Sequence, residues 1–103
     1  MIHVIATVEL KPGTREAFLA EFAKLIAPVR AEDGCIEYGP AIDAEGVGGF
    51  QTRMGPDTFV VVEKWASLDA LKAHAAAPHM AAYAAKVKDL IATRVIHVLS
   101  PAA

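Results

Sequence analysis

The residues best suited to chemistry in this chain are one carboxylate, Glu63, and two histidines that follow it. Glu63 lies in the segment TFVVVEKW, whose β-branched and aromatic residues are typical of a strand. Alternate residues of a strand share a face, so Glu63 lies on the same face as Val61 and Trp65, which we expect to be buried. A buried carboxylate is costly unless it is paired, neutralised or facing a cavity. Glu63 therefore predicts either an ion pair at the end of a sheet or a pocket carboxylate that orients an imidazole or holds a substrate hydroxyl.

His74 and His79 lie in the segment HAAAPH, with Pro78 between them. His74 is the better candidate for catalysis, because helical spacing places it on the inward side with Leu71. His79 falls in the first turn of a following helix, where both a structural and a functional role stay open. Metal-binding histidines on one helix usually stand four residues apart, and a helix break at Pro78 would disturb that geometry. A metal ion needs three or four ligands, and the sequence offers only Glu63 and His97 as evident additions to these histidines. We therefore expect no metal site.

Several other function classes find no support in the sequence. The one cysteine, Cys35, excludes an internal disulfide and is expected to be a small buried residue. The chain has no GxSxG motif, and the glycines of EGVGGF lack the lysine of a phosphate-binding loop. Ten basic and twelve acidic residues give a net charge of −2, which argues against a nucleic-acid partner. No apolar run is long enough for a membrane span and no signal peptide is evident, so we expect a cytoplasmic protein.

The elements that must position these residues fit one domain over residues 1–103. Alternation predicts a strand at 2–10, and β-branched and aromatic residues predict another at 58–65. We also expect strands at 35–43 and 93–99, with 50–52 as a further short strand. Apolar residues three and four apart predict a helix from Arg15, capped by Thr14 and closed or kinked near Pro28. A short helix capped by Ser67 and another that begins at Pro78 complete the chain. This order predicts an α+β, ferredoxin-like fold, a four-stranded antiparallel sheet with its helices on one face.

The strands also predict a partner. An antiparallel sheet with one wet face should alternate apolar and polar residues, but here both faces are apolar. Val60 and Val62 oppose the row of Val61, and Val95 opposes Ile96. The helices can cover only one face, and an exposed apolar face favours association. We therefore expect a homodimer in which two sheets pack face to face about a two-fold axis.

Three segments together resemble the antibiotic-biosynthesis monooxygenase family: VIATVELKPG at the start, RAEDGCIEY at 30–38 and EKWASLDALKAHAAAPHMAAY at 63–83. The spacing of E-x-W, of Leu71-x-x-His74 and of Pro78-His79 carries the likeness, which covers nearly the whole chain. The stretch GVGGFQTRMGPDTFVVVEKW, with PHMAAY and IHVLSPA, is similar in particular to the bacterial quinol-oxidising branch. The resemblance implies a dimeric α+β barrel that oxidises quinols or electron-rich phenols with dioxygen, without flavin, haem or metal.

The resemblance also implies roles for individual residues. His74 and Glu63 would transfer and orient protons in an apolar pocket. The remaining candidates would bind a small aromatic substrate. Trp65 and Phe59 would be walls of the pocket, and Tyr38 and Tyr83 would be hydrogen-bond partners. His79 would also contact the substrate, and Arg30 would either stabilise a developing anion or form a structural ion pair.

Two alternatives stay open at this point. One related branch isomerises a phosphorylated autoinducer sugar, which would require a cationic clamp where the expected pocket offers one arginine at most. A non-enzymatic, stress-response dimer that binds a hydrophobic ligand is the other. Haem degradation is disfavoured, because it would call for an asparagine and this chain contains none.

Overall fold

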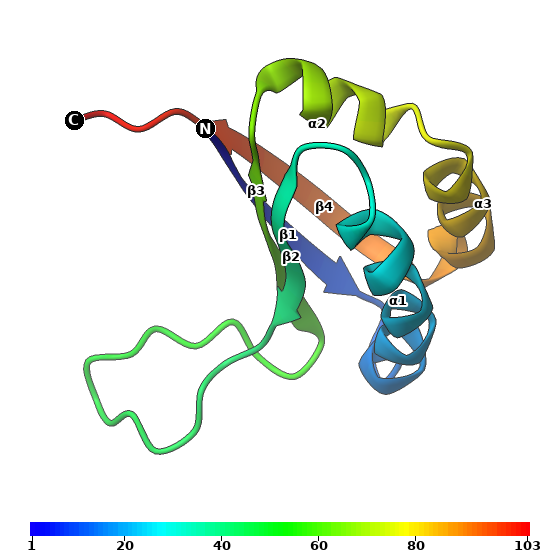
Figure 1. Ribbon diagram of the computed structural model, residues 1–103. Helices are drawn as coiled ribbons and strands as arrows, with labels where there is room; N and C mark the ends of the chain where they lie inside the picture. The colour runs from blue at the N-terminus through cyan, green and yellow to red at the C-terminus, as the bar shows by residue number, and fades with distance from the viewer.

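Four antiparallel strands form one sheet, and the three α-helices all lie on one side of it (Figure 1). The computed structural model describes residues 1–103. The elements follow in the order β1 (Ile2–Leu10), α1 (Arg15–Arg30), β2 (Cys35–Ala41), β3 (Thr58–Trp65), α2 (Leu68–Ala75), α3 (Pro78–Val87), a 3-10 turn at Lys88–Leu90 and β4 (Ile91–Leu99). The strands lie in the order β2-β3-β1-β4. This arrangement confirms the predicted ferredoxin-like α+β fold.

Strand register decides which side chains face the helices. Val4 of β1 lies opposite Glu63 of β3 and Val98 of β4, and Ala6 lies opposite Val61. Directly opposed residues of an antiparallel pair point to the same face. The sheet therefore sends Glu63 toward the helices together with the core residues of β1, as the alternation predicts.

Helix α1 closes the centre of this core with apolar residues spaced by three and four. Its buried residues are Phe18, Phe22, Leu25 and Val29. Pro28 lies inside the last turn, and the helix continues to Arg30. Burial of side chains of this size stabilises the fold by roughly 1.5–3 kcal/mol each.

The chain after α1 turns back sharply and carries Glu32 toward the start of α2. Gly34 has a φ of +81°, which favours glycine, and a Cβ at this position would lie 2.6 Å from the Cβ of Ala70. The carbonyl of Gly34 accepts a hydrogen bond from the N–H of Ala66 at 2.8 Å. This close approach ties the turn that bears Glu32 to the β3–α2 connection.

The segment between β2 and β3 differs from the prediction. It contains no strand at 50–52, and β2 ends at Ala41, before the expected residue 43. Phe50 is 87% exposed, so it has no apolar surface against which a strand could pack. Figure 1 shows the segment reaching away from the sheet and helices. Asp43 anchors its return, because its carboxylate accepts hydrogen bonds from the N–H groups of Met54 and Gly55.

Two of the predicted caps have different outcomes. Ser67 caps α2, with its Oγ accepting a hydrogen bond from the N–H of Ala70 at 3.1 Å. Thr14 precedes α1, but its side chain does not cap the helix. The hydroxyl of Thr14 donates instead to the carbonyl of Lys11 at 2.7 Å. The predicted N-cap position of Thr14 is therefore confirmed, but its side chain forms no capping hydrogen bond.

The face of the sheet away from the helices is apolar and uncovered in the single chain. Ile5 lies opposite Val62, and Val95 and Leu99 point the same way from β4. Val95 is 51% exposed and Leu99 47% exposed. The register thus confirms that both faces of the sheet carry apolar rows. No helix combines the length and hydropathy that crossing a membrane requires.

Candidate active site

A cavity of about 560 Å³ lies between the helix-facing side of the sheet and helices α2 and α3. Of its 21 lining residues, 17 are hydrophobic, which suits an apolar molecule of modest size. The four others are Glu63, His74, Lys88 and Arg94. The cavity therefore offers one carboxylate, one imidazole and two cations to whatever it binds.

Glu63 is buried in the wall of this cavity. Its Oε1 accepts a hydrogen bond from the indole Nε1 of Trp65 at 2.9 Å. Burial raises the pKa of the Glu63 carboxyl above its ordinary value, because loss of water disfavours the charged form. The Trp65 N–H and the nearby His74 oppose this rise in pKa only in part. Of the two readings that the sequence left open, the position of Glu63 corresponds to the pocket carboxylate.

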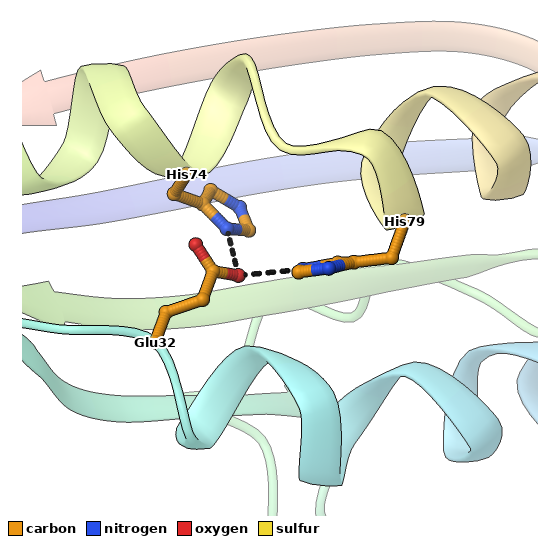
Figure 2. A group of neighbouring side chains, drawn as sticks. All are labelled: Glu32, His74 and His79. Carbon is orange, nitrogen blue, oxygen red and sulfur yellow. Dashed lines mark hydrogen bonds and ion pairs between the residues drawn. The ribbon is translucent and has the colours of Figure 1, made fainter.

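His74 stands between Glu63 and a second carboxylate, Glu32. Figure 2 shows His74 together with Glu32. Its Nδ1 lies 2.9 Å from Oε2 of Glu32, and its Nε2 lies 3.9 Å from Oε1 of Glu63. An ionised carboxylate only accepts hydrogen bonds, so Nδ1 carries the proton that bonds to Glu32. In a neutral imidazole the lone pair is then on Nε2. The ring therefore turns a proton acceptor toward Glu63 and the cavity.

His79 binds the same oxygen of Glu32 from the other side. Its Nε2 lies 2.8 Å from Oε2, as Figure 2 shows. The break between α2 and α3 returns the chain so that both imidazoles meet at one carboxylate. The two histidines lie on separate helices, as the break at Pro78 predicts, and they nevertheless meet at Glu32. The sequence offered no local signal for Glu32 as a site residue, because it lies in the turn after α1, 42 residues before His74 in the chain.

Aromatic rings form the floor of the cavity. Tyr38 stacks on Phe22 with the ring centroids 5.5 Å apart and the planes at 9°, and Phe59 lies 5.3 Å from Phe18. Burial raises the pKa of Tyr38 and of Tyr83, so both phenols stay protonated at neutral pH. The hydroxyl of Tyr83 is buried without a hydrogen-bond partner. It is therefore free to bond with a molecule in the cavity.

Three of the predicted substrate-binding residues lie outside the cavity lining. Trp65 is fully buried behind it, with its indole 4.6 Å from the His74 ring. Arg30 donates from Nε to the carbonyl of Tyr38 at 3.0 Å, so it holds β2 from outside the cavity. His79 contacts Glu32 instead. Arg94 supplies the arginine of the cavity. It shares a face of β4 with Ile96 and Val98, and this alternation was the sequence signal that could have identified it as a cavity residue.

The fold and the sequence both match proteins of one family. The antibiotic biosynthesis monooxygenase family matches residues 1–86. The chain belongs to this family. It is 40% identical to the protein named "Probable quinol monooxygenase YgiN" of Escherichia coli K12, over 98% of each chain.

Solved structures of related proteins agree with this assignment. The chain is similar to PA3566 from Pseudomonas aeruginosa, with a TM-score of 0.81 and 29% identity over 99% of this chain and 94% of that one. It is also similar to Rv0793 from Mycobacterium tuberculosis, with a TM-score of 0.78 and 33% identity over 97% and 93%. The predicted family resemblance is therefore confirmed, and the chain is a member of a monooxygenase family.

The raised pKa of Glu63 predicts a pH-dependent stability. A carboxyl whose pKa is higher in the folded than in the unfolded state stabilises the fold below the unfolded value, here about 4.5, and loses that contribution as pH rises through the folded value. The Glu63→Gln variant keeps an oxygen for the Trp65 N–H and does not titrate. The free energy of unfolding of the wild type, relative to this variant, should decrease as the pH rises above about 4.5. Urea titrations across that range measure it, and a constant difference would show that burial does not disfavour the charged form of Glu63.

Proposed function

We propose that this protein oxidises a quinol or a similar electron-rich phenol with dioxygen inside the cavity, without flavin, haem or metal. The observation that carries the proposal is the composition of the cavity. It is apolar on most of its surface, and it holds the imidazole of His74 beside Glu63 and the unpartnered hydroxyl of Tyr83. The name of the YgiN relative supports the same substrate class.

The first step is removal of a proton from the hydroxyl of the substrate. Nε2 of His74 carries the lone pair that accepts it, and a positioned base of this kind accelerates proton transfer by about 10²–10⁴-fold. The hydroxyl of Tyr83 donates to an oxygen of the substrate, and Arg94 stabilises the phenolate that forms. The apolar walls hold the aromatic ring and exclude water.

The phenolate is a better electron donor than the phenol, and dioxygen is the acceptor. In the simplest balance, two electrons and two protons pass from the quinol to dioxygen, which yields the quinone and hydrogen peroxide. Insertion of one oxygen atom into the ring begins from the same deprotonated state. The protein therefore needs to supply only a base, an oriented ring and a dry cavity.

We also propose that the working unit is a homodimer formed through the sheet face that the helices leave uncovered. Ile5, Val62, Val95 and Leu99 supply the apolar surface for this contact. Light scattering coupled to gel filtration should return about twice the 10.9 kDa chain mass. The mass of a single chain across a range of concentrations would contradict the dimer.

Oxygen uptake with a reduced naphthoquinone tests the activity. Ala84 and its neighbour Ala85 are both exposed on α3, but only Ala84 lines the cavity. The Ala84→Trp variant should lower kcat/KM by about tenfold or more, because the indole occupies the substrate volume. Ala85→Trp carries the same side chain on the same helix and should leave the rate unchanged.

Uptake by the wild type must exceed the spontaneous oxidation of the quinol in buffer. A wild-type rate equal to that background would refute the oxidase proposal. Equal rates for the two tryptophan variants would show instead that the reaction takes place outside this cavity.

One observation supports a second candidate. Arg94 and Lys88 both line the cavity. Two cations are therefore available, whereas the sequence predicted at most one arginine. A phosphorylated sugar would need such a clamp, as an isomerase of this family would provide. A sugar phosphate that inhibits the oxidation of the naphthoquinol by competing for the cavity would favour this candidate. The inhibition should be weaker in an Arg94→Gln variant.

A further inference from the structure

We propose that Glu32, His74 and His79 form a binding site for a divalent transition-metal ion such as Zn²⁺, and that the bound ion inhibits the enzyme. The ligands come from three separate elements: the turn after α1, the last turn of α2 and the first turn of α3. The binding site goes beyond the proposed function, whereas the inhibition rests on it.

The chemistry and spacing of the three ligand atoms suit such an ion. Two imidazole nitrogens and one carboxylate oxygen are a set that Zn²⁺ and its neighbours accept, with a water in the open position. The three atoms lie within 4.8 Å of one another. Ligand bonds of about 2.0–2.2 Å place neighbouring ligand atoms roughly 3–3.5 Å apart. The observed separations of 2.9 and 2.8 Å between Glu32 and the two imidazoles need only a small expansion.

A further carboxylate lies near the second ring nitrogen of His74. A histidine that binds a metal usually directs its other ring nitrogen at a carboxylate, which fixes the orientation of the ring. Nε2 of His74 faces Glu63 at 3.9 Å, and Trp65 holds that carboxylate in place by its N–H. The ring of His74 is further fixed by its contact with the Trp65 indole.

A route for the ion leads in from the surface at His79. The side chain of His79 is 34% exposed, that of Glu32 is 15% exposed and that of His74 is 6% exposed. An ion would meet His79 and Glu32 first and reach His74 last. Water at the exposed side can complete its coordination shell.

Metal binding would change the tautomer of His74. A metal bond to Nδ1 requires a lone pair at that nitrogen, so the ring proton moves to Nε2. Nε2 then donates toward Glu63 and can no longer accept a proton from the substrate. The same imidazole therefore serves either the ion or the proposed reaction, but not both at once.

Calorimetric titration with ZnCl₂ tests the binding, using the full chain freed of metal by a chelator. The wild type should bind one ion per chain. Glu32→Gln and His79→Gln should weaken this binding by about tenfold or more, because each removes a ligand. His3→Gln and His97→Gln are matched controls from β1 and β4, outside the cluster, and should bind as the wild type does.

The absorption spectrum of the Co²⁺ complex provides a readout that does not depend on activity. Visible bands that appear with one equivalent of Co²⁺, and that vanish in Glu32→Gln, would support the site. His79 begins a helix near the surface, so His79→Gln should fold, and circular dichroism checks this. No saturable binding, or equal weakening in the His3 and His97 controls, would overturn the site.

Oxygen uptake tests the inhibition separately. Zn²⁺ should inhibit the wild type at concentrations that fill the site, and His79→Gln should require at least about tenfold more ion to lose half of its own rate. Saturated binding without inhibition would overturn the inhibitory role. Absence of turnover in the metal-free wild type would refute the proposed oxidase instead, and would leave the calorimetric result intact.

Discussion

Replacement of His74 by glutamine is expected to lower kcat/KM for quinol oxidation by about 10²–10⁴-fold, the usual contribution of a positioned base. Glutamine can still form a hydrogen bond with Glu32, but it has no lone pair that accepts a proton at neutral pH. The loss should therefore fall mainly on kcat, since the apolar walls that hold the ring are unchanged. Oxygen uptake at several quinol concentrations separates the two parameters.

The matched control for this experiment is Lys72→Gln. Lys72 lies on α2 two residues before His74, but it is exposed and does not line the cavity, so its loss should leave the chemical step intact. Binding of the oxidised quinone, followed by fluorescence, would check that the His74→Gln cavity still forms. If this variant retained the wild-type kcat, another residue of the cavity would have to be the base.

Truncation of Trp65 to alanine is expected to cost about 3–5 kcal/mol of the free energy of unfolding. Trp65 is fully buried, so its removal leaves a void in the core and leaves Glu63 without the indole N–H. The total stability of a chain of this length is only about 5–15 kcal/mol. The variant should consequently lie close to the limit of folding at room temperature.

Trp65→Phe separates the packing of this side chain from its hydrogen bond. Phenylalanine fills much of the volume but donates nothing to Glu63, and an unpaired buried acceptor costs about 1–3 kcal/mol. The pKa of Glu63 should rise further in Trp65→Phe, because the lost Trp65 N–H lowers that pKa in the wild type. Urea denaturation of both variants gives the two contributions. A loss below about 1 kcal/mol in Trp65→Ala would contradict the packing argument.

The sequence by itself determined the elements and the faces they bury. Period-two alternation set the strand that contains Ile5, and β-branched and aromatic residues set the strand that contains Glu63. Spacing by three and four set the helix that contains Phe18. These patterns are local, because a side chain's face depends only on the backbone geometry of its own element. The same rule placed Glu63 and His74 on inward faces before any contact was known.

Local patterns could not fix the segment between β2 and β3. Phe50, Gln51 and Thr52 have residue types that fit a strand, but a strand needs a neighbour with free backbone groups. Both long sides of β3 are already paired, with β1 and with β2, and the segment does not pair with the free edge of β2 either. The carboxylate of Asp43 and the glycine turns decide this loop instead.

Tertiary structure alone decided the partners of the site. Glu32 is separated from His74 by 42 residues and from His79 by 47, so no spacing rule could join them. The choice of Arg94 over Arg30 likewise depends on how β4 joins the edge of the sheet. A sequence pattern specifies the direction in which a side chain points from its own element. The atom that it meets there depends on how distant elements pack, and only the folded chain determines that.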